Sequence, residues 1–156
     1  MRLVHLGLLL VFALMMGWAE WSKPLRVLGQ QAPAGDQAKL QGKWKGWVVN
    51  DKGENPEQGP VHLELTVQGD EIKAKQLNPG ADPNLGEGTF KLALMGDKRH
   101  IDAVRTSTPG KGQTYAGIYQ IDGDTWKWCT GTPKRPRPED FATRKGQFLL
   151  ILKRQK

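Results

Sequence analysis

The sequence predicts an all-β protein, folded as an eight-stranded antiparallel up-and-down barrel. Nineteen glycines and ten prolines in 156 residues are more than a helical bundle tolerates, because both residues weaken helix interiors and serve turns. From Leu40 onward the chain divides into eight short apolar or alternating segments separated by turn signals. Consecutive short strands of this kind close into a barrel, which removes exposed edges. A two-sheet sandwich is the alternative.

The eight predicted strands each follow a turn signal or alternate between apolar and polar residues. They are residues 44–49, 61–68, 71–77, 89–94, 100–106, 113–121, 125–130 and 148–153. The first runs into Asn50-Asp51-Lys52-Gly53, a sequence with strong turn character. The second alternates at every position, as a half-buried strand does. The third follows Gly69-Asp70 and has apolar residues on one face and charged residues on the other. The fourth alternates again after a loop rich in glycine and proline.

The last four strands are delimited by further turns. The fifth follows Gly96-Asp97 and has an ambiguous facing, and the sixth follows Pro109-Gly110. Asp122-Gly123 then predicts a two-residue hairpin, because such a turn needs positive φ at positions that Asp and Gly accept. The hairpin leads to the seventh strand, and a longer basic loop leads to the eighth.

The first nineteen residues have the pattern of a cleavable signal peptide. Arg2 precedes an apolar run from Leu3 to Met16, and small residues up to Ala19 precede Glu20. The run is shorter than the about 20 apolar residues of a membrane-spanning helix. We therefore expect residues 1–19 to be removed on export to the periplasm or the extracellular space, with no stable membrane insertion afterwards. A retained anchor is the alternative.

The rest of the chain divides into a tether and one domain. Residues 20–38 contain Pro24 and Pro33 and no sustained period, so we expect a flexible tether there. Residues 39–156 form the β-barrel domain. The single cysteine, Cys129, excludes an internal disulfide, and its place in a strand-like run favours a buried thiol over a reactive one.

Six stretches between Leu40 and Arg154 carry a resemblance. They are Leu40-Gln41-Gly42-Lys43-Trp44, Gly86-Glu87-Gly88-Thr89-Phe90, Gly117-Ile118-Tyr119-Gln120-Ile121-Asp122-Gly123-Asp124-Thr125, Cys129, Arg137-Pro138-Glu139-Asp140-Phe141 and Leu152-Lys153-Arg154. In this order they resemble the lipocalin-like domain family of exported proteins typical of planctomycetes. The resemblance implies a lipocalin-like barrel closed at one end by Gly42, Trp44 and Arg154, with the guanidinium over the indole, a contact worth about 0.5 to 2 kcal/mol.

Aromatic residues in the predicted strands are the candidates for a ligand site. They are Phe90, Tyr115, Tyr119, Trp126 and Trp128. If they point into the barrel, they form an aromatic-lined interior that suits a flat or apolar ligand. The alternative is that the rings fill the interior, because each aromatic side chain buries a large area.

The loop before the last predicted strand is basic. It carries Lys134, Arg135, Arg137, Arg144 and Lys145. The formal net charge is +7, and it falls to +6 when residues 1–19 and the one charge of Arg2 are removed. Such a loop favours contact with an anionic polymer, and a solvated loop is the alternative.

No catalytic group is expected. Beyond residue 19 the chain has two serines, Ser22 and Ser107, and two histidines, His62 and His100, none in a nucleophile motif. Two isolated histidines do not make a zinc site, and Asp122-Gly123-Asp124 is explained by a hairpin turn. We expect no metal, no cofactor and no specific nucleic acid, and a monomer.

These observations favour an exported, non-enzymatic binding module that holds a small apolar ligand or a cell-envelope component in or at the mouth of the barrel. The alternative is a structural or interaction domain with a filled core, which contacts a protein or an anionic polymer through its loops. The volume of the interior discriminates between them, because ligand pockets are usually several hundred Å3 in volume and mainly apolar.

Overall fold

The computed structural model describes residues 30–50, 59 and 61–156, so the predicted signal peptide lies outside the described residues. Within these described residues there are one helix and nine strands, and the strands form a single sheet. They are β1 (Gln30–Gln31), α1 (Asp36–Leu40), β2 (Gly42–Asn50), β3 (Val61–Gln68), β4 (Glu71–Gln76), β5 (Asn84–Met95), β6 (Lys98–Arg105), β7 (Thr114–Asp122), β8 (Thr125–Gly131) and β9 (Gln147–Arg154).

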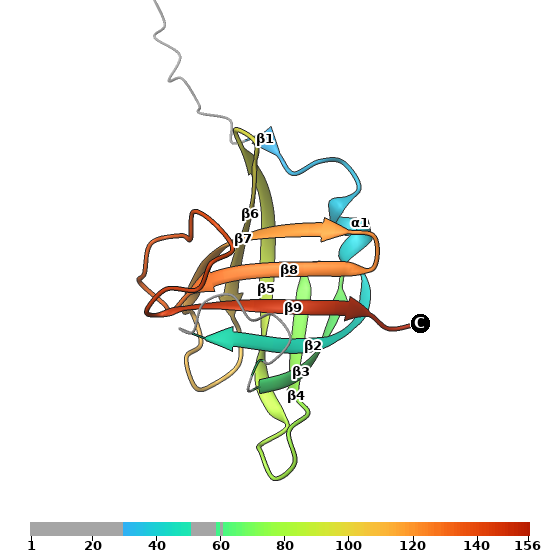
Figure 1. Cartoon of the computed structure of the whole chain (residues 1–156), viewed down its shortest axis with the longest axis vertical. Helices are drawn as coiled ribbons and strands as arrows, with labels where there is room; N and C mark the ends of the chain where they lie inside the picture. Colours follow the sequence, from blue (N-terminus) through green and yellow to red (C-terminus); the bar gives the residue numbers. More distant parts are fainter. Residues whose placement is uncertain (1–29, 51–58, 60) are drawn as a thin grey trace, which may run out of the picture.

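Strands β2 to β9 close into an antiparallel barrel. Each of them pairs with the next along the chain, and β9 pairs back onto β2, with Trp44 opposite Arg154 and Asn50 opposite Phe148. Figure 1 shows β2, β9 and β8 side by side across the front of the barrel. Because β9 bonds to both β2 and β8, the sheet has no open edge at this point. The predicted eight-stranded up-and-down barrel is confirmed, and the two-sheet sandwich is excluded.

The fourth predicted strand is longer than its alternation indicated. β5 begins at Asn84, five residues before the predicted start, and its pairing with β4 shifts register between Ala74 and Lys75. The added segment contains Gly86 and Gly88, which contribute no apolar side chain to the period-two pattern. The sequence signal is therefore missing where the backbone still pairs.

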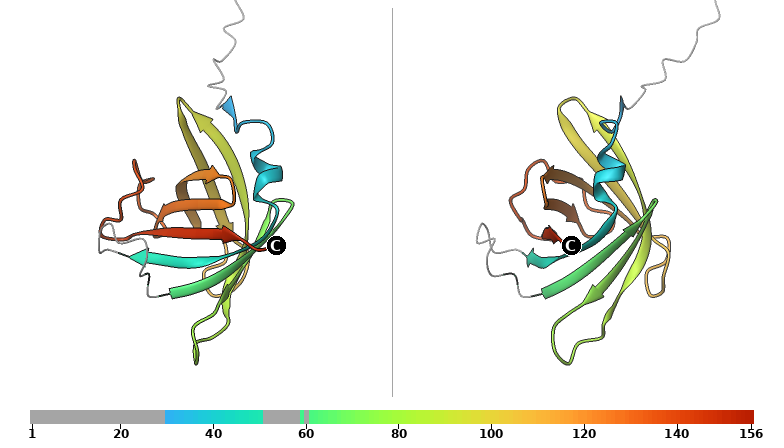
Figure 2. Two further views of the ribbon diagram at one scale, coloured as in Figure 1. Left: turned by 45° about the vertical axis from the view of Figure 1, so that its right-hand side comes forward. Right: turned by 90° about the vertical axis from the view of Figure 1, so that its right-hand side faces the viewer.

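The predicted flexible tether over residues 20–38 is wrong in its described part. Gln30 and Gln31 pair with the outer end of β5, and α1 begins at Asp36, whose side chain is 1% exposed. Figure 2 shows α1 beside the barrel end from which the C-terminus emerges. A helix of five residues is too short to show a period, and its burial comes from contacts with distant strands. No helix among the described residues is long and apolar enough to cross a bilayer.

Apolar side chains gather on both faces of the barrel wall. Inward-facing residues of all eight barrel strands form the main core, which includes Trp44, Leu65 and Phe90. A second, outer cluster consists of Val49, Ile118, Cys129, Leu149 and Ile151, with Trp47 and Phe141 packed against it. The four residues at 149–152 of β9 are therefore all buried. This continuous apolar run is typical of a strand covered on both faces.

Burial of Cys129 predicts an inert thiol. The side chain is 0% exposed, and burial, followed by the charge of Asp140, raises its pKa to about 11 from 9.0. At pH 8 we expect a disulfide reagent such as dithiobis-nitrobenzoate to leave Cys129 of the folded protein unmodified and to modify it fully in urea. Rapid modification of the folded chain contradicts the assignment.

The same pKa predicts a loss of stability in alkali. The raised pKa means that unfolded Cys129 releases its proton at lower pH than folded Cys129 does. Its contribution is therefore complete below about pH 9 and is lost between about pH 9 and 11. Urea unfolding of the wild type and of Cys129→Ala at pH 8 and 10.5 measures this loss. We expect the pH-dependent loss to be larger in the wild type.

Candidate functional site

The interior of the barrel is hollow at one end. A cavity of about 300 Å3 lies where β2, β4, β6 and β8 end and β3, β5, β7 and β9 begin. Its wall consists mainly of inward-facing aliphatic and aromatic side chains, among them Leu63, Leu65, Ile72, Leu85, Phe148 and Leu150. We call this end the mouth. The opposite end, beside α1, is the base.

A row of three tryptophans separates the cavity from the base. Trp44 meets Trp126 edge-on, with 5.6 Å between ring centroids, and Trp126 stacks on Trp128 at 5.8 Å. Trp128 also lines the cavity, so it is the end of the row that faces the mouth. Gly117 makes room for it, because a Cβ at that position would lie 2.6 Å from Nε1 of Trp128.

The base is closed by Trp44, Arg154 and Gly42. The Arg154 guanidinium carbon lies 4.2 Å from the Trp44 ring centroid, and Nη1 donates a hydrogen bond of 2.8 Å to the Gln41 carbonyl. The Trp44 indole N–H donates to the Leu40 carbonyl at 2.8 Å, which ties the ring to α1. Gly42 has φ +106, a conformation that favours glycine, and it lies close to Arg154. The arrangement matches the one that the resemblance implied.

The five aromatic residues proposed for the interior belong to the inner core but not to one site. Tyr115 and Trp128 line the cavity. Phe90, Tyr119 and Trp126 are buried deeper in the core and do not line it. The tryptophan row and Tyr119 therefore fill the half of the barrel nearer the base, and the other half is hollow.

Tyr119 contributes to closing the base rather than to lining the cavity. Its hydroxyl donates a hydrogen bond of 2.9 Å to Oδ2 of the buried Asp36, and Nε of Arg99 lies 3.2 Å from the same oxygen. Burial, followed by the hydrogen bond and charge of Asp36, raises the pKa of Tyr119 far above its ordinary value. The three side chains hold α1 against the barrel.

The mouth has a polar side that the sequence analysis missed. Arg105 lines the cavity at the end of β6, and its Nε donates to the Ser107 carbonyl at 3.3 Å. Nearby, the Tyr115 hydroxyl donates to Oε1 of Gln113 at 3.3 Å. Arg105 shares the alternation of Ile101 and Ala103, so its inward direction follows from the strand period. The ambiguous pattern of that segment concealed it.

Arg137 of the basic loop binds the barrel wall. Its Nη1 donates to the Gly117 carbonyl at 2.6 Å, and its Nη2 pairs with Asp102 at 2.7 Å. Burial, followed by the charge of Arg137, lowers the pKa of His100 on the same strand as Asp102. The guanidinium thus holds the loop onto the outer face of β6 and β7.

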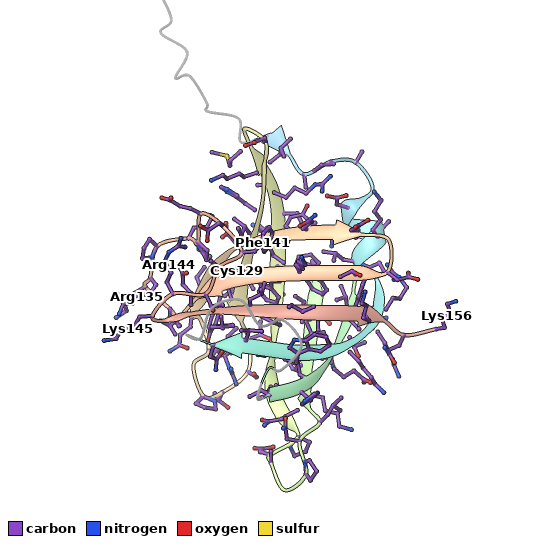
Figure 3. All side chains as sticks on the ribbon, in the orientation of Figure 1. Cys129, Arg135, Phe141, Arg144, Lys145 and Lys156 are labelled. Carbon is purple, nitrogen blue, oxygen red and sulfur yellow. The ribbon has the colours of Figure 1, made fainter. Side chains whose placement is uncertain are left out.

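The other cations of the basic loop differ in their contacts. Arg144 forms two hydrogen bonds of 2.7 Å with the Asp140 carboxylate, which raises the pKa of Arg144 and lowers that of Asp140. Lys134, Arg135 and Lys145 are exposed and form no ion pair with any described residue. Figure 3 shows Arg144 near Phe141 and Cys129, with Arg135 and Lys145 farther out.

The remaining chemistry of the described residues is sparse. Within 30–50, 59 and 61–156, no three His, Cys, Asp or Glu side chains are placed to hold a metal ion.

No protein-family model matches the sequence, and no curated protein is significantly similar to it. The geometry of the cavity is therefore the main indication of what this protein does.

Proposed function

We propose that this protein is an exported, non-enzymatic binding module that holds a small apolar ligand in the cavity at the mouth of its barrel. The observation that carries the proposal is a mainly apolar space of about 300 Å3 in a barrel whose other end is closed. Ligand pockets have volumes of roughly 300 to 1,000 Å3 and place a few polar groups in a largely apolar wall. Arg105, Thr130 and the backbone of residues 86–88 are the polar groups here.

The size of the cavity limits the ligand. A volume of about 300 Å3 corresponds to about ten water molecules, at roughly 30 Å3 each in the liquid. The enclosed part of the ligand therefore has about ten non-hydrogen atoms, the size of a medium-length alkyl chain or a two-ring aromatic. A carrier of larger lipids needs more space, so only part of such a molecule would enter.

Two further parts of the proposal rest on the sequence. Export rests on the signal-like residues 1–19. The lipocalin-like character rests on the six quoted stretches, and the closed eight-stranded barrel supports it. A cell-envelope molecule with one small apolar end is therefore within the proposal, and such a molecule would be retained on purification from the natural source and detected by native mass spectrometry.

Filling the cavity is expected to weaken binding. Ala74 lies on β4 opposite Leu65 and lines the cavity, so Ala74→Phe places a ring in the empty space. In calorimetric titrations we expect at least one of 1-hexanol, 1-decanol and naphthalene to bind the wild type with saturation. We expect Ala74→Phe to bind that probe about tenfold more weakly or worse, a change of about 1.4 kcal/mol.

Ala93→Phe is the matched control. Ala93 lies between the inward-facing Leu92 and its neighbour Leu94 on β5, and it belongs to neither apolar cluster. The same added ring there leaves the cavity empty, so binding is expected to match the wild type. If none of the three neutral probes binds the wild type with saturation, the proposal is contradicted. That result favours the alternative, an interaction domain, whose contacts would involve Lys134, Arg135 and Lys145.

A further inference from the structure

The polar side of the mouth indicates which class of ligand the cavity binds. This inference rests on the proposed function. We propose that the cavity selects a molecule with one carboxylate on an apolar chain, with the carboxylate bound by Arg105 and the chain in the cavity. Three features support this: the position of the guanidinium at the rim, the absence of a carboxylate partner for it among the described residues, and the size of the apolar space behind it.

Arg105 is held at the rim with its terminal nitrogens available. It is partly buried, it lines the cavity, and its Nε is engaged by the Ser107 carbonyl. Its guanidinium lies against Gly86, where a Cβ would come within 2.6 Å of Nη2. Among the described residues no carboxylate pairs with Arg105, and no hydrogen bond from its Nη1 or Nη2 is formed. Within the described part of the chain, the positive charge of Arg105 therefore has no compensating carboxylate.

Glu87 is the acidic residue among the described residues of the cavity wall, and it does not neutralise this charge. Glu87 is directed to Lys73 on the neighbouring strand, with 3.3 Å between Oε1 and Nζ, and its side chain is half exposed. Its backbone N–H is occupied by the Ser107 hydroxyl, which accepts the hydrogen bond at 2.9 Å. The Glu87 carboxylate is thus paired with Lys73, and among the described lining residues it does not compensate the charge of Arg105.

The same groups favour a carboxylate over a doubly charged phosphate. The planar fork of a guanidinium matches the two oxygens of a carboxylate. The single guanidinium compensates one negative charge, and a second negative charge on the ligand would have no cation opposite it among the described lining residues. Behind the rim, Leu63, Leu65 and Leu150 form an apolar wall for about ten chain atoms. A medium-chain carboxylate satisfies both parts of the site.

Three probes with chains of ten carbons test the inference. Decanoate, 1-decanol and decyltrimethylammonium are titrated into the intact chain at pH 8 and low ionic strength. The two charged probes are kept below their micelle-forming concentrations and 1-decanol below its solubility limit. We expect decanoate to bind about tenfold more tightly than 1-decanol, and decyltrimethylammonium to bind most weakly. Because Arg105 is partly exposed, the preference is expected to shrink as salt is added.

Variants of Arg105 separate charge from packing. Arg105→Gln is expected to remove the roughly tenfold preference for decanoate over 1-decanol, Arg105→Lys to retain part of the preference, and Arg105→Glu to reverse it toward decyltrimethylammonium. Lys43→Gln removes the same charge from an exposed residue near the base and is expected to keep the preference. Far-ultraviolet circular dichroism checks that each variant is folded.

A spectroscopic measurement on the wild type does not depend on any variant. The carboxyl carbon of 13C-labelled decanoate is expected to titrate at lower pH when bound than when free, because the guanidinium favours the charged form. Equal affinity for decanoate and 1-decanol, an unshifted bound carboxyl, or a preference that persists in Arg105→Gln overturns the inference and leaves the proposed function standing. If neither decanoate nor any neutral probe binds, the proposed function fails as well.

Discussion

Replacing Trp44 with alanine is expected to lower the free energy of unfolding by about 3 to 5 kcal/mol. Trp44 is 0% exposed, packs on Trp126, lies under the Arg154 guanidinium and donates its N–H to Leu40. Because the surrounding strands are bonded in a closed sheet, they collapse only partly into the space that the indole leaves. Urea unfolding followed by circular dichroism measures the change.

Lys45 provides the control for this prediction. It is the next residue on β2, points outward and forms a partly exposed ion pair of 3.5 Å with Glu64. Lys45→Ala is expected to cost at most about 1 kcal/mol. A double-mutant cycle of Trp44→Leu with Arg154→Met then isolates the ring–guanidinium contact, expected at about 0.5 to 2 kcal/mol. A loss for Trp44→Ala no larger than that for Lys45→Ala shows that the base does not depend on the indole.

Replacing Asp36 with alanine is expected to cost about 2 to 3 kcal/mol of the free energy of unfolding. The Asp36 carboxylate accepts the Tyr119 hydroxyl and pairs with Arg99, and it is 1% exposed. Without it the buried hydroxyl has lost its acceptor, and an unsatisfied buried polar group costs about 1 to 3 kcal/mol. Arg99 is about one-third exposed, so solvent replaces part of its pairing.

Ionisation of Tyr119 gives this prediction a second readout. Burial and Asp36 raise the pKa of Tyr119 above its ordinary value of 10.0, so the folded protein keeps the phenol proton where the unfolded protein releases it. Its contribution is therefore complete below pH 10 and is lost as the pH rises further. In Asp36→Ala the phenol is expected to ionise at lower pH than in the wild type, as measured by ultraviolet absorbance.

Tyr119→Phe separates the hydrogen bond from the rest of the base. It removes the hydroxyl and leaves the ring, so it is expected to cost less than Asp36→Ala, and the two changes together are expected to cost less than their sum. Full additivity, or an unchanged phenol titration in Asp36→Ala, contradicts the link between α1 and the barrel wall.

The two ends of the barrel differ in how far their residues could be predicted. The quoted resemblance indicated Gly42, Trp44 and Arg154 at the base. The mouth was indicated only in part, by Tyr115 and Trp128. The aliphatic side of the cavity was implicit in the alternation of residues 61–68, but a periodic pattern marks which face a side chain takes and not whether the space in front of it is filled.

Arg105 and Asp36 illustrate what local patterns leave out. Arg105 stands at an inward position of β6, where a charged residue obscures the apolar alternation, and it reaches solvent only because the strand ends there. Asp36 is polar, lies in a five-residue helix and is buried by Tyr119, a residue 83 positions away. Such burial depends on long-range contacts, which local composition does not report.

For this protein the sequence by itself determined the all-β class, the eight barrel strands and most of their turns, because strand alternation and turn chemistry depend on neighbouring residues. Tertiary structure decided the closure of β9 onto β2, the folding of residues 30–40 onto the barrel, and the division of the interior into a filled base and a hollow mouth. The physical reason is that cavity volume is the difference between the space that the closed sheet encloses and the volume of the side chains directed into it. That difference exists only when all eight strands are assembled.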